Sequence, residues 1–514
     1  MTRRKSDPTV LAPLRHNSHR RPVTRREFLA QGFLTGSAYV AMPAVLSLLT
    51  QPRSALAAMD CALGGGTGNI PFLCFDLAGG ANIAGSNAMV GTTAQMAPLS
   101  LSGYRMLGLP EELTPGRIVG AAFNDEFGLK FHPDSAMLRG MLARTSATTR
   151  ANVNGVVIAA RSANDTGNNP HNPVYGINKA GASGGLLELV GTEASDSGGN
   201  SLAPMDMIDP SKRPTKIDRP SDARGLVDTG EMVNMLGTTG AGDVMQAIED
   251  ISKDKIALMA EEEAVSDVVT CAYEQSRQLI VDFGDPDALD PLLDKDIAAG
   301  DPLDPSLIPI FADANEVNGT SHYRKTASVM KLVVEGKAGA GTIEFGGYDY
   351  HNSTRTTGEQ RDELAGESIG AALEFAARRN QDLMIYVFSD GSVFSNGQVD
   401  NNVGKGVWTG DNSSTAASLI LVYGKDGRPP LRNADNQIGI YRDSGSVETS
   451  HSLPSVQISN SPELLAEAIV LNYLALHGRE GDYASVMNNA PKLAGSAAEL
   501  DQLIGFTNIR APGV

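Results

Sequence analysis

A carboxylate and an imidazole lie one residue apart, as Asp349 and His351, in the stretch 341–352, GTIEFGGYDYHN. The run 342–345 predicts a short strand, and the paired glycines after it allow the chain to turn sharply where that strand ends. In open parallel sheets this end of a strand is where ligands bind. The two side chains can therefore converge on one metal ion or one proton. The alternative is that Asp349 caps the next turn and that His351 lies solvated on a loop.

Other polar side chains lie next to further strand-like runs. They are Asn82 after the run 70–77, His171 after 153–160, Ser389 and Asp390 after 383–388, and Asp411 with Asn412 before 417–423. If the strands are parallel, these loops meet at one edge of the sheet. Carboxylates and histidines gathered there suit a divalent metal, and two such metals suit hydrolysis of phosphate or sulfate esters. The alternative is that each residue caps a helix or forms a turn, since Asp, Asn and Gly are common turn residues.

The elements that must position these side chains alternate along the chain. Runs such as 383–388, LMIYVF, are continuously apolar, which suits a strand buried on both faces of a parallel sheet. Apolar residues at helical spacing predict helices at 243–283, 321–335, 358–379 and 462–477. The alternation predicts an α/β fold with a mostly parallel central sheet, helices on both faces and loop-rich insertions.

The first 57 residues have the three parts of a secretory signal, namely a basic start, a weakly apolar stretch and a small-residue cleavage box. Arg25 and Arg26 favour the twin-arginine route, which predicts a periplasmic or secreted protein and the twin-arginine translocase as partner during export. An N-terminal membrane anchor is the alternative, but glycines and a proline interrupt the apolar run before it reaches about 20 residues.

Residues 58–514 are predicted to form one α/β domain with no transmembrane segment after signal removal. This domain includes a Gly/Ser/Pro-rich insertion at 191–242, expected over the surface, and a helical and Asp-Pro-rich segment at 243–335. Cys74 lies within an apolar run, which favours a buried free thiol over a bridge to Cys61.

Charge excludes two classes of partner. The full chain has a net charge of −18, and the signal segment holds nine Lys/Arg and two Asp/Glu, which leaves 33 basic and 58 acidic residues. A net charge of about −25 repels polyanions. We therefore expect no nucleic acid and no anionic lipid as partner.

Taken in order, these motifs resemble the twin-arginine-exported proteins of the domain-of-unknown-function 1501 family, which are similar to sulfatases of the alkaline-phosphatase superfamily. The resemblance covers most of the mature chain. Three of its parts are the strand leading into Gly79-Gly80-Ala81, the stretch Phe127-Gly128-Leu129 with His132-Pro133, and the loop around His171. The fourth is Gly346-Gly347-Tyr348-Asp349-Tyr350-His351, which looks like the family's Gly-Gly-Trp-Asp-x-His. It implies a divalent metal held by Asp349, His351, Asp390, Asp411 and Asn82, with His171 contacting the substrate.

The chain also departs from the family pattern. Asn82 stands where the family has Asp, Asp390 stands where it has Glu, and Asn412 replaces a His. Asn is a weaker metal ligand than a carboxylate or an imidazole. Ser389 is the foremost candidate nucleophile, and Ser86 is conceivable, but neither has an evident base. These departures favour a non-catalytic binding or assembly factor of the cell envelope, and the alternative is a metal-dependent hydrolase of sulfate or phosphate esters.

Overall fold

The computed structural model describes residues 69–164, 167–226 and 285–510, together with some residues between 236 and 251. Residues 64–228 and 286–514 form one compact unit. The predicted signal segment 1–57, and almost all of the predicted helix 243–283, lie outside the described residues.

An eight-stranded sheet is the centre of this unit, with the strand order β12-β2-β11-β6-β1-β5-β3-β4. Of these strands only β11 runs antiparallel to its neighbours, so the predicted mostly parallel α/β fold is confirmed. The strands of this sheet are β1 (Phe72–Leu77), β2 (Val153–Ile158), β3 (Leu187–Gly191), β4 (Thr215–Lys216), β5 (Ala338–Phe345), β6 (Leu383–Phe388), β11 (Ser418–Tyr423) and β12 (Gln437–Ile438).

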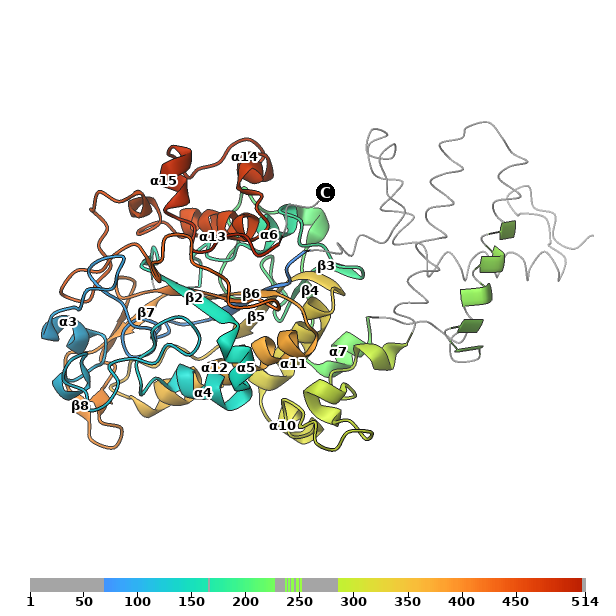
Figure 1. Cartoon of the computed structure of the whole chain (residues 1–514), viewed down its shortest axis with the longest axis horizontal. Helices are drawn as coiled ribbons and strands as arrows, with labels where there is room; N and C mark the ends of the chain where they lie inside the picture. The colour runs from blue at the N-terminus through green and yellow to red at the C-terminus, as the bar shows by residue number, and fades with distance from the viewer. Residues whose placement is uncertain are drawn as a thin grey trace, which may run out of the picture. The chain divides into compact units, whose positions relative to one another are not determined.

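Helices cover both faces of the sheet (Figure 1). Alternate residues of β1 separate the two cores: Leu73 and Phe75 pack on the face of α4, α11 and α12, whereas Phe72 and Cys74 pack on the face of α6 and α13. Cys74 is a buried free thiol. The helices are α3 (Leu101–Met106), α4 (Ala136–Arg144), α5 (Ala147–Ala151), α6 (Val174–Lys179), α7 (Pro220–Arg224), α10 (Ala314–Gly319), α11 (Ser321–Val334), α12 (Thr356–Arg378), α13 (Pro462–Leu476), α14 (Tyr483–Val486) and α15 (Ala497–Asp501).

Two small antiparallel ribbons lie between β6 and β11 in the chain. One pairs β7 (Ser392–Phe394) with β10 (Gly410–Asn412), and the other pairs β8 (Val399–Asp400) with β9 (Lys405–Gly406). The β7–β10 ribbon begins just after β6 ends and leads the chain into β11. Because β11 is antiparallel, its first residue, Ser418, lies beside Ile158 at the carboxyl end of β2. The ribbon therefore brings residues 410–412 to the same edge of the sheet as the exits of the parallel strands.

The segment 191–242 differs from the expected surface insertion in its first part. Ser197 and Ser201 are buried, and the backbone N–H groups of Asn200 and Ser201 both donate to Asp76 at the end of β1, at 2.8 Å. The Gly/Ser-rich composition predicted a surface loop, but this part packs against the sheet edge. Glycine and serine are small enough to fit closely against backbone.

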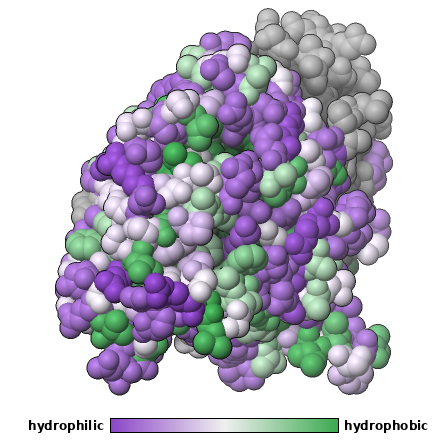
Figure 2. Space-filling model, turned by 60° about the vertical axis from the view of Figure 1, so that its left-hand side comes forward, coloured by the Kyte–Doolittle hydropathy of each residue, from purple (hydrophilic) through white to green (hydrophobic). Residues whose placement is uncertain are grey.

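The surface of the described residues is mixed in character. Figure 2 shows hydrophilic side chains over most of one face, with apolar ones scattered among them. Within the described part of the chain, no helix is both long and apolar enough to span a bilayer.

Candidate metal centre

The exits of β1 and β5 are bound to each other by backbone hydrogen bonds. The N–H of Ala78 donates to Phe345 (2.9 Å), and the N–H of Tyr348 donates to Ala78 (3.1 Å). Gly79 then has a φ of +114°, and a Cβ there would lie 2.7 Å from the backbone nitrogen of Asp349. Only glycine allows this close approach. The paired glycines therefore place Asp349 directly over the turn that follows β1.

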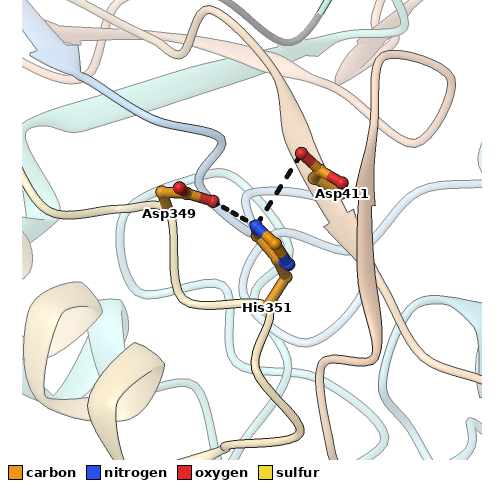
Figure 3. Close-up of side chains that lie close together, drawn as sticks. All are labelled: Asp349, His351 and Asp411. Atoms are coloured by element: carbon orange, nitrogen blue, oxygen red, sulfur yellow. Dashed lines mark ion pairs between the residues drawn. The ribbon is translucent and has the colours of Figure 1, made fainter.

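Asp349, His351 and Asp411 converge at this edge. His351 Nε2 lies 2.6 Å from Asp349 Oδ1 and 3.8 Å from Asp411 Oδ2, and all three side chains are reachable from solvent. Figure 3 shows the first two on the loop after β5 and Asp411 on β10, turned toward one another. One ligand atom from each residue falls within 4.8 Å of the others, so this group could hold a metal ion.

The donor set fits a divalent cation. Two carboxylate oxygens and one imidazole nitrogen suit zinc and similar transition metals. The same nitrogen of His351 faces both carboxylates, so a cation between them would use its lone pair. Three protein ligands would leave coordination positions for water or another molecule.

Asp390 lies beside this group but has a different set of contacts. Its buried carboxylate accepts from the N–H of Gly79 at 2.7 Å and from the side-chain amide of Asn200 at 3.3 Å. Asp390 thereby holds the turn on which Asp349 rests, and it is not in the group of converging ligands. Its role as a metal ligand stays a prediction.

Ser389 holds the same turn from its other side. Its hydroxyl donates to the carbonyl oxygen of Leu77 at 2.6 Å and accepts from the N–H of Ala81 at 2.8 Å. The hydroxyl proton is therefore already shared with the backbone, and the side chain is buried. This geometry gives Ser389 a structural task, and its two hydrogen bonds both go to main-chain groups rather than to a side-chain base.

His171 is buried beneath the edge rather than open to a substrate. Its Nε2 lies 2.8 Å from the hydroxyl of Ser162, and its ring packs against Phe388. Burial lowers its pKa to about 3, so the imidazole is neutral. Nδ1 has no hydrogen-bond partner within the described part of the chain. The contact of His171 with a substrate stays a prediction.

Asn82 is also withdrawn from the group. Its side-chain amide donates to Ser86, its N–H donates to the Tyr350 hydroxyl at 2.8 Å, and its carbonyl accepts from Asn87 at 2.6 Å. Its side chain is buried and engaged with Ser86. The structure thus brings together three of the five residues predicted as ligands.

Two further residues at this edge were not among the predicted catalytic or metal-binding residues. Asp76 ends β1 and is fully buried; burial, reinforced by the neighbouring Asp390, raises its pKa to about 7 against the effect of the Ser201 N–H. Arg161 follows β2 and donates to the hydroxyl of Ser413 at 3.0 Å, two residues beyond Asp411. It forms no ion pair with any described residue, and its buried Nε has no partner there. The available signal was a charged residue near the end of an apolar strand for Asp76, and a charged residue shortly after a strand for Arg161.

No protein-family model matches the chain, and no curated protein matches it at a significant level. The family resemblance drawn from the motifs therefore stays a prediction. A function for this chain must accordingly be inferred from the geometry of the site.

Proposed function

We propose that this chain is an exported protein of the cell envelope that binds a divalent cation and serves as a non-catalytic binding or assembly factor. The observation that carries the proposal is the convergence of Asp349, His351 and Asp411 at the carboxyl edge of the sheet. The twin-arginine signal predicted at 1–57 is the reason for proposing a location in the cell envelope, because that route exports folded proteins.

Three contacts favour a non-catalytic role. Asp390 and Asn82, the other two residues predicted as ligands, are committed to hydrogen bonds within the protein. The hydroxyl of Ser389 already donates to Leu77. Ester hydrolysis by two metals needs ligands for both ions and a free nucleophile or metal-bound water. A non-catalytic binding factor needs only one cation, held by three side chains.

The second candidate is a metal-dependent hydrolase of sulfate or phosphate esters, and Arg161 is the observation that favours it. Arg161 is only partly exposed, has no carboxylate partner in the described part of the chain, and contacts Ser413 close to Asp411. Guanidinium groups bind the oxygens of sulfate and phosphate. A substrate oxyanion between Arg161 and a bound cation would use both charges.

The deciding experiment measures zinc bound to the purified full-length chain by calorimetry, together with turnover of nitrophenyl sulfate and nitrophenyl phosphate. We expect one zinc per chain, no turnover, and loss of zinc binding in Asp349→Ala and His351→Ala. Asp426→Ala is the matched control, because this acid is exposed and its ion pair with Lys425 is a long one, at 3.8 Å.

The alternatives give different results. Turnover that disappears in Asp349→Ala and falls in Arg161→Ala would establish the hydrolase instead. Zinc binding that persists unchanged in both Asp349→Ala and His351→Ala would rule out this cation site.

A further inference from the structure

Tyr350 lies between two of the converging ligands and faces the opposite way. It is 3% exposed, whereas the side chain of Asp349 is 62% exposed and that of His351 is 29% exposed. The N–H of Tyr350 donates to the carbonyl of Tyr348 at 3.0 Å, so the chain turns at Asp349, with both tyrosines buried and Asp349 outside. The Tyr350 ring rests against α12, where a Cβ on Gly358 would lie 2.9 Å from it. The loop after β5 is anchored on α12 by this side chain and by buried Tyr348, whose hydroxyl donates to the carbonyl of Arg361 at 2.9 Å.

The hydroxyl of Tyr350 belongs to a closed ring of buried hydrogen bonds. It donates to Oδ1 of Asp362 at 3.1 Å and accepts from the N–H of Asn82 at 2.8 Å. The side-chain amide of Asn87 closes the ring, since it donates to Oδ2 of Asp362 at 2.7 Å and to the carbonyl of Asn82 at 2.6 Å. The ring ties the loop after β1 and the loop after β5 to one carboxylate on α12.

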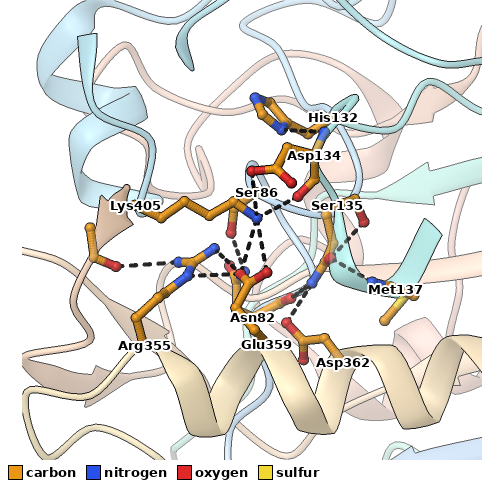
Figure 4. Close-up of polar contacts among 12 residues, drawn as sticks. Asn82, Ser86, His132, Asp134, Ser135, Met137, Arg355, Glu359, Asp362 and Lys405 are labelled. Carbon is orange, nitrogen blue, oxygen red and sulfur yellow. Dashed lines mark hydrogen bonds and ion pairs between the residues drawn. The ribbon is translucent and has the colours of Figure 1, made fainter. Parts of the chain in front are cut away.

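The orientation of Asn87 is fixed from a third side. Its carbonyl oxygen accepts from the hydroxyl of Ser135 at 2.7 Å and from the N–H of Met137 at 3.2 Å, at the start of α4. Figure 4 shows Asn82, Ser135 and Asp362 gathered around this point, beside the buried ion pairs of Lys405 and Arg355 with Glu359. Each donor and acceptor of the ring is thus matched, which makes the arrangement rigid.

We propose that Tyr350 and Asp362 are positioning residues that hold Asp349 and His351 at the spacing needed for a divalent cation. The inference rests on the proposed function and deepens it, because it names what preorganises the site. Neither residue would touch the cation. They fix the position of the loop between Asp349 and His351. Without the Tyr350 hydroxyl, the ring stays buried and Tyr348 still holds the start of the loop, but the hydrogen bonds of residue 350 to Asn82 and Asp362 are lost.

The test compares Tyr350→Phe with Tyr473→Phe in the full-length chain, with zinc alone as the probe. Tyr473 is also buried and also donates one hydrogen bond, at 2.8 Å to the carbonyl of Ile70, but that carbonyl precedes β1 at the opposite end of the strand. Both variants remove one hydroxyl, so we expect similar losses of thermal stability. Partners that orient metal ligands typically contribute roughly 10- to 100-fold in affinity. We expect the zinc dissociation constant to rise about tenfold in Tyr350→Phe and to stay unchanged in Tyr473→Phe.

Asp362→Asn is the second variant. An amide at residue 362 has one acceptor oxygen where the carboxylate has two, so it cannot accept at both positions, one facing the Tyr350 hydroxyl and the other the Asn87 amide. We expect weaker zinc binding than in Tyr350→Phe. Equal zinc affinity in the wild type and Tyr350→Phe would overturn the inference while leaving the cation site intact. Absence of zinc binding in the wild type would instead remove the proposed function, and this inference with it.

Discussion

Asp76 is a buried carboxyl group whose protonation differs between the folded and the unfolded chain. Its pKa is about 7 in the fold, raised by burial and by Asp390, against 3.8 for an unperturbed Asp. Below pH 3.8 both states are protonated. As the pH rises from there toward 7, the unfolded chain releases a proton that the folded chain retains, so this group lowers stability progressively. The loss reaches about 4 kcal/mol at most, at about 1.4 kcal/mol per pKa unit.

The substitution Asp76→Asn isolates this effect. The new carbonyl oxygen can accept the N–H bonds of Asn200 and Ser201, and the new amide can donate to the Ser201 hydroxyl, so the hydrogen bonds survive. We expect the stability of the variant, relative to wild type, to rise between pH 4 and pH 7. Denaturant unfolding at several pH values measures this difference. Parallel curves for the two proteins would contradict the raised pKa.

The role of a single residue could be predicted where both its chemical type and its spacing from neighbouring residues pointed to a site. Asp349 and His351 were found because a strand, two glycines and two ligand types follow one another. His171 and Ser389 have suitable chemistry, but a sequence does not show that one is buried against Phe388 and that the other shares its proton with Leu77. Tyr350 was hidden because its partners, Asn82 and Asp362, lie in other elements.

The turn after β1 is the element on which the site geometry depends most. Gly79 has a positive φ, where a side chain costs about 1–2 kcal/mol, and a Cβ there would also press on Asp349. We expect Gly79→Ala to weaken zinc binding at least tenfold, because the Asp349 loop must move. Gly116→Ala is the control, since its φ of +84° carries the same backbone cost with nothing within 4 Å of the new Cβ. Equal zinc affinities in the two variants would show that Asp349 does not depend on this turn.

The strongly apolar strands were predictable, and their directions were not. β6 (LMIYVF) and β11 (SLILVY) have the same apolar character, yet only β11 is antiparallel. Asp411 lies at the same sheet edge as Asp349 and His351 because of that reversal. The residues that precede an antiparallel strand lie at the edge where the parallel strands of the sheet end. β3 and α6 were missed because both are short and lie among Gly- and Ser-rich loops, where local composition predicts turns.

At the scale of the whole molecule, the sheet joins parts of the chain that are distant in sequence. The converging ligands come from the exit of β5 and from β10, about 60 residues apart, and their loops rest on the exits of β1 and β6. Alternation of strands and helices predicted that such an edge exists. Which loops approach each other depends on the strand order, which places β1 between β5 and β6 and leaves no periodic pattern in the sequence.

A cation that bridges these distant segments stabilises the whole fold, because the unfolded chain does not bring the ligands together. Binding to the native state alone adds about 2.7 kcal/mol to the free energy of unfolding at a free zinc concentration of 100 times Kd, and about 1.4 kcal/mol for each further tenfold. Trp408, the single tryptophan, is buried, and its backbone bonds the loop that follows His351, so its fluorescence reports unfolding near the site. We expect the denaturation midpoint of the wild type to rise with zinc and that of His351→Ala to stay constant. A midpoint that does not respond to zinc in the wild type would mean that these ligands do not form a cation site in the native fold.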